Sequence, residues 1–126
     1  MKLDHDCVRS LLLELEEKLS LNSIFDNSHI KELKTYEEFG EEQTFYTTLK
    51  LIEAKFLIGT SQFYLDESYE FAITSISHSG HELLDNIRDS KIWSQTKSSV
   101  SALSGVSLSI IGSVAADLVK KSVGLP

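Results

Sequence analysis

The fold is decided by residues 41–77, which read EEQTFYTTLKLIEAK (41–55), FLIGTSQFY (56–64), LDES (65–68) and YEFAITSIS (69–77). Apolar side chains recur at helical spacing in the first segment, which predicts a helix. The second and fourth segments are rich in β-branched and aromatic residues, and the third consists of turn-forming types. Residues 56–77 therefore predict a β-hairpin, whose second strand alternates apolar and polar residues.

The predicted helix over 41–55 has two faces. Its acidic first turn, Glu41 and Glu42, suits the positive end of a helix dipole. Four apolar side chains are expected to point toward the core, namely Phe45, Leu49, Ile52 and Phe56. The outer side would then carry polar and aromatic types that suit contacts with a partner, namely Gln43, Thr44, Tyr46, Thr47, Thr48 and Lys50.

Upstream of this helix the pattern is clear at first and then ambiguous. Residues 4–19 place apolar side chains at steps of three and four, which predicts an amphipathic helix with Asp4 as its N-cap. Residues 22–40 fit neither the helical nor the strand period. They are interpreted as a short strand or loop followed by a short helix, which Gly40 ends.

Downstream of the hairpin the sequence predicts three further helices. Ser79 followed three residues later by Glu82 predicts a capping box that opens a helix over residues 79–89. A bend near Asp89 would lead into another helix, in which Trp93 is a core or interface anchor.

The last stretch, residues 101–126, has a broad apolar stripe and ends in a pair of lysines that suit a helix C-terminus. It predicts a long C-terminal helix. Serines interrupt its apolar run, which argues against a membrane span of about 20 apolar residues.

This order of elements resembles that of a winged helix, in which a recognition helix precedes a β-hairpin called the wing. The expected fold class is therefore α+β, a winged helix with additional C-terminal helices. Residues 1–100 would form the winged-helix domain, with 41–55 as recognition helix, 56–77 as wing and 79–89 as capped helix. The helix over 101–126 would belong to the same domain.

A closer resemblance lies in three places. They are MKLDHDCVR (1–9), GHELLDNIRD (80–89) with Ile92 and Trp93, and VSL (106–108) with Gly124 and Leu125. Together they resemble a family of small proteins with a domain of unknown function from bacteria, prophages and phages. The resemblance implies a winged-helix fold and an origin in a mobile element. It implies no catalytic residue.

Composition limits the environment and the partner. The chain has 126 residues, a net charge of −7 and a single cysteine, Cys7, and its N-terminus lacks the features of a secretory signal. A cytoplasmic protein is expected. Proteins that bind duplex DNA through many phosphates present a basic face, so the acidic balance argues against that mode of binding.

Catalysis and metal binding find little support. His78 and His81 lie near Glu82 and Asp85, but helix geometry need not bring them together, and no second cluster has zinc-like spacing. Cys7 lies beside His5 and Asp6, but adjacent residues on a helix point in different directions. No nucleophile elbow, phosphate loop or metalloprotease motif occurs. We expect neither an enzyme, nor a metal, nor a cofactor.

Binding of another protein is the expected function, in an accessory or regulatory role that could include inhibition of a host nucleic-acid-binding protein. The candidate contact residues are Gln43, Tyr46, Thr47, Lys50, Tyr64 and Tyr69. The alternative is a transcriptional regulator that reads a DNA sequence and forms a homodimer through its C-terminal helix. The candidate dimerisation residues are Leu108, Ile111, Gly112, Ala115 and Leu118, and packing of this stripe within the monomer is the other open interpretation.

Overall fold

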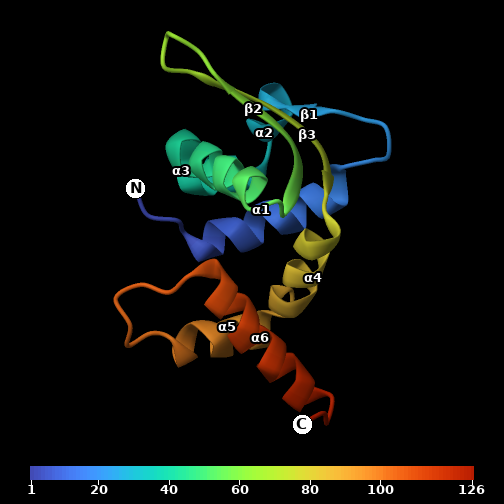
Figure 1. Ribbon diagram of the computed structural model, residues 1–126, viewed down its shortest axis with the longest axis vertical. Coiled ribbons are helices and arrows are strands. Elements are labelled where there is room, and N and C mark those ends of the chain that lie inside the picture. The colour runs from blue at the N-terminus through green and yellow to red at the C-terminus, as the bar shows by residue number, and fades with distance from the viewer. The chain divides into compact units, whose positions relative to one another are not determined.

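The computed structural model describes residues 1–126 as six helices and three strands (Figure 1). The helices are α1 (His5–Lys18), α2 (Asn27–Ile30), α3 (Lys34–Glu53), α4 (His78–Ile87), α5 (Ser90–Ser99) and α6 (Leu108–Ser122). The strands are β1 (Phe25–Asp26), β2 (Leu57–Phe63) and β3 (Tyr69–Ile76). The expected α+β class is confirmed, and so is the hairpin that follows the helix ending at Glu53.

The chain divides into two compact units, residues 1–81 and 82–126. The first holds α1 to β3 and the start of α4, and the second holds the rest of α4 with α5 and α6. The expectation that residues 1–126 form a single domain stays a prediction.

A three-stranded antiparallel sheet with the order β1-β3-β2 organises the first unit. Its register is irregular between Ile58 and Gly59, which pair with Ser75 and Ile73, so that Thr74 is an extra residue on β3. Because of the extra residue, the side chains of β3 that face the core are the odd-numbered ones before Thr74 and the even-numbered ones after it. Phe71 and Ile73 point into the core before it, and Ile76 does so after it.

Helix α1 begins where the sequence predicts. The Asp4 carboxylate accepts hydrogen bonds from the backbone N–H groups of Asp6 and Cys7, which confirms Asp4 as the N-cap. The buried face of α1 consists of Cys7, Val8, Leu11, Leu12 and Leu15. These side chains form the part of the core against which α3 packs.

Helix α3 is two helical segments joined at a kink. Gly40 has φ 84° and ψ 167°, a backbone conformation that side chains other than glycine rarely adopt. The sequence correctly marked a break at Gly40, and the helical residues before it, from Lys34, agree with the short helix expected to end there. The second segment ends at Glu53, two residues before the predicted end at Lys55, which has a positive φ of 64°.

The predicted faces of α3 are wrong by about one position. In the segment after Gly40 the fully buried side chains are Thr44, Thr47, Thr48 and Leu51, whereas Phe45 and Leu49 are only half-buried. The threonines are small enough to let α3 approach α1, and their hydroxyls find partners: Thr44 donates to the Thr35 carbonyl and Thr48 to the Thr44 carbonyl. Hydrogen bonding removes most of the cost of burying these hydroxyls.

The predicted capping box at Ser79 and Glu82 is also wrong. Helix α4 starts at His78, and the Ser77 hydroxyl accepts the hydrogen bond from the backbone N–H of Gly80. Ser79 lies inside the first turn, where its hydroxyl contacts that of Ser77. Strand β3 ends at Ile76, and the capping serine, Ser77, lies two residues before the one that the motif indicated.

In the second unit α5 packs against α6. Asp89 caps α5 by accepting from the backbone N–H of Ile92, so the predicted bend at this position is confirmed. Trp93 is buried, as expected of an anchor. The C-terminal helix is shorter than predicted: Ser107 caps it, and residues 101–107 are not helical.

Candidate functional site

A groove of about 760 Å³ lies in the first unit between α3 and the base of the hairpin loop. Its floor and walls come from α2, α3, the turn before β3 and the first residue of the chain. The lining residues are Met1, Asn27, Lys31, Glu41, Glu42, Phe45, Tyr46, Leu49, Lys50, Glu53, Glu67, Ser68 and Tyr69.

The groove exists because of how α3 is turned. Its threonine side faces α1, so the apolar side chains of Phe45, Tyr46 and Leu49 lie on the side away from α1 and line the groove. Phe45 is held in place by rings, because its centroid lies 5.3 Å from that of Phe71 and 6.0 Å from that of Tyr36. An aromatic wall is thus fixed beside open space.

Three of the six predicted contact residues meet in this groove: Tyr46, Lys50 and Tyr69. Tyr69 packs on Phe71 in a near-parallel stack with ring centroids 5.9 Å apart. The other three lie elsewhere. Thr47 is fully buried, so the prediction that it lies on the outer side is wrong.

Gln43 and Tyr64 are outside the groove lining. The Gln43 side-chain amide donates to the Lys2 carbonyl at 3.5 Å, and so lies beside the start of the chain. The Tyr64 hydroxyl donates to the Glu70 carboxylate at 2.8 Å on the hairpin. This bond raises the pKa of Tyr64, because the neighbouring carboxylate disfavours the phenolate.

Lys50 is engaged within the protein. Its ammonium donates to the Glu53 carboxylate at 2.9 Å and lies 5.3 Å from the centroid of the Tyr46 ring. The bond to Glu53 raises the pKa of Lys50. Its charge is therefore partly compensated before any partner arrives.

The electrostatic character of the groove follows from its lining. Four carboxylates line it, from Glu41, Glu42, Glu53 and Glu67, against two lysines, Lys31 and Lys50. The Tyr36 hydroxyl donates to Glu41 at 2.7 Å, which keeps that carboxylate at the groove edge. The site is thus an apolar groove with an acidic border.

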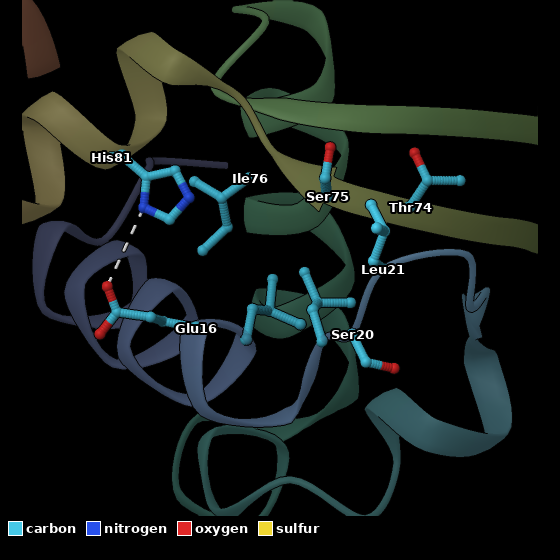
Figure 2. Close-up of a pocket in the computed structure, with 9 residues that line it drawn as sticks. Glu16, Ser20, Leu21, Thr74, Ser75, Ile76 and His81 are labelled. Atoms are coloured by element: carbon cyan, nitrogen blue, oxygen red, sulfur yellow. Dashed lines mark ion pairs between the residues drawn. The ribbon is translucent and has the colours of Figure 1, made fainter.

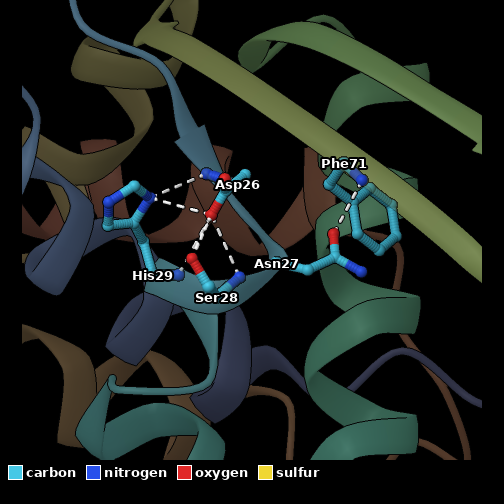
Figure 3. Close-up of polar contacts among 5 residues, drawn as sticks. All are labelled: Asp26, Asn27, Ser28, His29 and Phe71. Atoms are coloured by element: carbon cyan, nitrogen blue, oxygen red, sulfur yellow. Dashed lines mark hydrogen bonds and ion pairs between the residues drawn. The ribbon is translucent and has the colours of Figure 1, made fainter.

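Asn27 positions the hairpin that forms one side of the groove (Figure 3). Its side-chain amide donates to the Tyr69 carbonyl at 2.9 Å, and its side-chain oxygen accepts from the Phe71 backbone N–H at 2.8 Å. These two bonds reproduce with a side chain the pattern by which a neighbouring strand would pair with β3. Asn27 thereby continues the short β1 along β3.

Asp26, Ser28 and His29 lie together in Figure 3, and their residue types are those of a hydrolase triad. The connections are different. The Ser28 hydroxyl donates to the Asp26 carboxylate at 2.6 Å, and the His29 Nδ1 accepts from the backbone N–H of Asp26 at 3.1 Å. In a triad the histidine would take the proton of the serine. This set is a capping box that starts α2.

A second, smaller cavity of about 200 Å³ lies between the end of α1 and the end of β3 (Figure 2). Ile76 points into it, and the His81 ring faces Glu16 with 3.9 Å between Nδ1 and the carboxylate. No other charged side chain lines it. No three histidine, cysteine, aspartate or glutamate side chains in the chain come close enough together to hold a metal ion.

Cys7 is buried between α1 and α3. Burial raises the pKa of its thiol to about 11, against the opposing effect of hydrogen bonds with Thr47 and Thr44. The side chain of Cys7 is fully buried. The thiol is a packing group within the α1–α3 core.

The candidate dimerisation residues of α6 divide into buried and half-buried ones. Ile111 and Ala115 are buried within the chain, so they belong to the internal packing that was the open alternative. Leu108, Gly112 and Leu118 are half-buried. A Cβ atom on Gly112 would lie 3.2 Å from the Leu83 side chain, which shows how near α6 comes to α4 here.

Comparison with known proteins adds one finding. Residues 2–107 match the DUF2513 family, which is described as a hypothetical protein. The chain belongs to the DUF2513 family. The match covers the first unit from residue 2 onward and ends at Ser107, immediately before α6. No curated protein and no solved structure shows significant similarity to it.

The family membership agrees with the resemblance to a domain of unknown function in the sequence. It adds no residue roles. Among the helices of this DUF2513 protein, none combines the length and the apolar character that crossing a membrane requires.

Sequence reasoning missed several groove residues, above all Phe45, Leu49 and Asn27. The two apolar residues were assigned to the core because they are apolar. A signal was present in the three threonines at positions 44, 47 and 48, which occupy one face at helical spacing. Nothing in the sequence indicated that Asn27 would bond to a strand more than forty residues away.

Proposed function

We propose that this protein is a winged-helix binding module that holds another protein in the groove between α3 and the hairpin. The supporting topology is the order helix, strand, two helices and hairpin, with β1 beside β3 in the sheet. In a winged helix the helix before the hairpin is the one that meets the partner. Here that helix is α3, which supplies more of the groove lining than any other element.

The observation that carries the proposal is the apolar row of Phe45, Tyr46 and Leu49 on the accessible side of α3, with Tyr69 opposite. Aromatic side chains in partly formed clefts are the residues that most often dominate the energy of protein interfaces. Rings already held by neighbours lose little conformational entropy on binding. The groove is thus prepared for an apolar side chain of a partner.

The acidic border narrows the class of partner. A surface with lysine or arginine around an apolar anchor would complement both parts of the groove. The nucleic-acid-binding surface of another protein has this composition, so inhibition of such a protein is one form that the accessory or regulatory role would take. For a protein of the proposed prophage origin, the target would be a protein of the host.

A capture experiment tests the proposal. Tagged protein would be incubated with lysate of its own bacterium, with and without nuclease, and the bound material analysed by mass spectrometry and by sequencing. We expect a defined protein that remains after nuclease treatment and is captured in smaller amounts as the salt concentration of the incubation rises. Recovery of a discrete DNA site in place of a protein would contradict the proposal.

The second candidate function is sequence-specific DNA binding through α3 and the hairpin, which the same topology favours. Lys50 would then contact a phosphate or a base. Lys50→Glu should weaken binding to a DNA site and flatten its dependence on salt. If neither changes, Lys50 has no part in DNA binding. The pairing of Lys50 with Glu53 and the four carboxylates of the groove weigh against this function.

A further inference from the structure

Strand β2 forms an open edge of the sheet. It pairs with β3 on one side only, since the sheet order is β1-β3-β2. Residues 60–63 are exposed, and at the two ends Ile58 and Phe63 are 53% and 59% exposed. Figure 1 shows the hairpin continuing past α3 to its loop.

The sequence of this edge is unusual for an unpaired strand. Leu57–Phe63 reads LIGTSQF and contains no charged residue and no proline. Exposed edge strands normally carry lysine, proline or another feature that prevents pairing with a second chain. The register irregularity lies at one end, between Ile58 and Gly59, and leaves the strand regular from Gly59 to Phe63.

The hydrogen bonds of the hairpin show which backbone groups face outward. Tyr64 N–H donates to the Ser68 carbonyl, so this pair is hydrogen-bonded. In an antiparallel pair such residues alternate with ones whose N–H and C=O point the other way. Ser61 and Phe63, paired with Phe71 and Tyr69, therefore direct these groups to the open edge.

We propose that β2 pairs antiparallel with β2 of a second copy of this chain, about a two-fold axis at Ser61. Ser61 would lie opposite Ser61 of the second copy, and Gly59 opposite Phe63. Gly59, Ser61 and Phe63 all direct their N–H and C=O groups to the open edge. In this register each outward N–H of one copy therefore lies opposite an outward C=O of the other and can donate to it.

Charge favours this occupant and this register. The paired strands bring no charges together, although the protein has a net charge of −7. Because the strands would run antiparallel, the hairpin loop of each copy, which carries Asp66 and Glu67, would lie toward the start of β2 in the other copy, two residues after Lys55. An acidic loop and an exposed lysine would therefore lie near each other at each end of the pair.

This pairing shares with the proposed binding groove only the loop residue Glu67. It uses the backbone edge of β2, and no residue of β2 lines the groove. A protein that stays monomeric would therefore not contradict partner binding in the groove, and failure to bind a partner would not contradict the pairing of β2.

Sedimentation velocity of the full chain over a series of concentrations is the first test. Wild type should form a reversible dimer. Ser61→Lys places two like charges opposite each other at the axis and should raise the dimer dissociation constant at least tenfold. Gln62→Lys is the matched control, because its position faces Thr60 of the second copy, and its effect should be much smaller. Circular dichroism would show that both variants stay folded.

Two further variants test the register. Ser61→Cys should form a disulfide between copies, since opposed residues of such a pair lie within disulfide reach, and Gln62→Cys should form little. Glu67→Lys should weaken the dimer, and Lys55→Glu added to it should restore it. A wild type that stays monomeric up to its solubility limit would overturn the proposal. A dimer that Ser61→Lys leaves intact would overturn it equally.

Discussion

Three threonines determine which side of α3 faces the core. Thr44, Thr47 and Thr48 are fully buried against the α1 side, while the larger apolar residues beside them are only half-buried. Small side chains allow two helices to approach closely, and the hydroxyls are satisfied by carbonyls or by Cys7. This orientation of α3 matters for the proposed function, because it leaves the aromatic side chains on the side that lines the groove.

Cys7 should be unreactive in the folded protein. Its thiol is buried and has a pKa of about 11, so almost no thiolate is present at neutral pH. We expect iodoacetamide to label it only after denaturation. Mass spectrometry after treatment at neutral pH, with and without denaturant, checks this. Rapid labelling of the native protein would mean that α1 and α3 separate readily.

Gly59 should not tolerate a side chain. A Cβ atom at this position would collide with the Ala72 carbonyl on the paired strand. We expect Gly59→Ala to lower the free energy of unfolding by about 1–3 kcal/mol, as overpacking usually does. Gly112→Ala is the control, because its Cβ would meet only the end of the Leu83 side chain. Urea denaturation of the two variants should separate them clearly.

Asp26 should contribute stability that depends on pH. Hydrogen bonds from the Ser28 hydroxyl and the His29 backbone N–H lower its pKa below the ordinary value of 3.8. The folded state thus favours the carboxylate, so the contribution is complete above pH 3.8 and is lost as the pH falls through the lowered pKa.

Asp26→Asn keeps a capping side chain but removes this titration. We expect the difference in denaturation midpoint between wild type and this variant to shrink as the pH falls below 3.8. A difference that stays constant from neutral pH to pH 3 and below would show that the carboxylate charge has no such role.

At the scale of elements, the position of the hairpin relative to α2 depends on Asn27. Asn27→Ala would leave the Phe71 N–H without its acceptor in a part-buried place, which typically costs about 1–3 kcal/mol. Asn27→Asp can still accept from Phe71 but cannot donate to Tyr69, so its loss should be smaller. Chemical denaturation measures both. Equal losses would show that the bond from the Phe71 N–H carries no weight of its own.

The elements also show what the sequence could and could not predict. Helix α1, its cap and the hairpin follow from local patterns, since periodicity and capping residues act over a few positions. The face of α3 does not, because it depends on how closely α1 approaches. Local motifs also misplaced the start of α4, where Ser77 replaces Ser79 as the cap, since the end of β3 decides where the helix can begin.

The candidate site was predictable only in part for the same reason. Tyr46, Lys50 and Tyr69 could be chosen as exposed residues of the helix and the hairpin. Phe45 and Leu49 belong to the groove because the threonines displace them from the core. Asn27 belongs to it through contacts distant in sequence, which no local pattern shows.

At the scale of the whole molecule, net charge and the groove act together. A charge of −7 attracts basic surfaces over several ångströms at low salt and repels nucleic acid. The apolar residues of the groove act only on contact. Association with a basic partner should therefore become slower as salt is added, whereas dissociation should change much less.

The most direct test of the central claim is the affinity of groove variants for the captured protein, measured by titration calorimetry. Tyr46→Ala should weaken binding about tenfold or more, as loss of an interface anchor does. Tyr64→Ala, which changes a tyrosine outside the groove, should bind like wild type. If Tyr64→Ala weakened binding and Tyr46→Ala did not, the partner would bind elsewhere on the hairpin and the groove would not be its site.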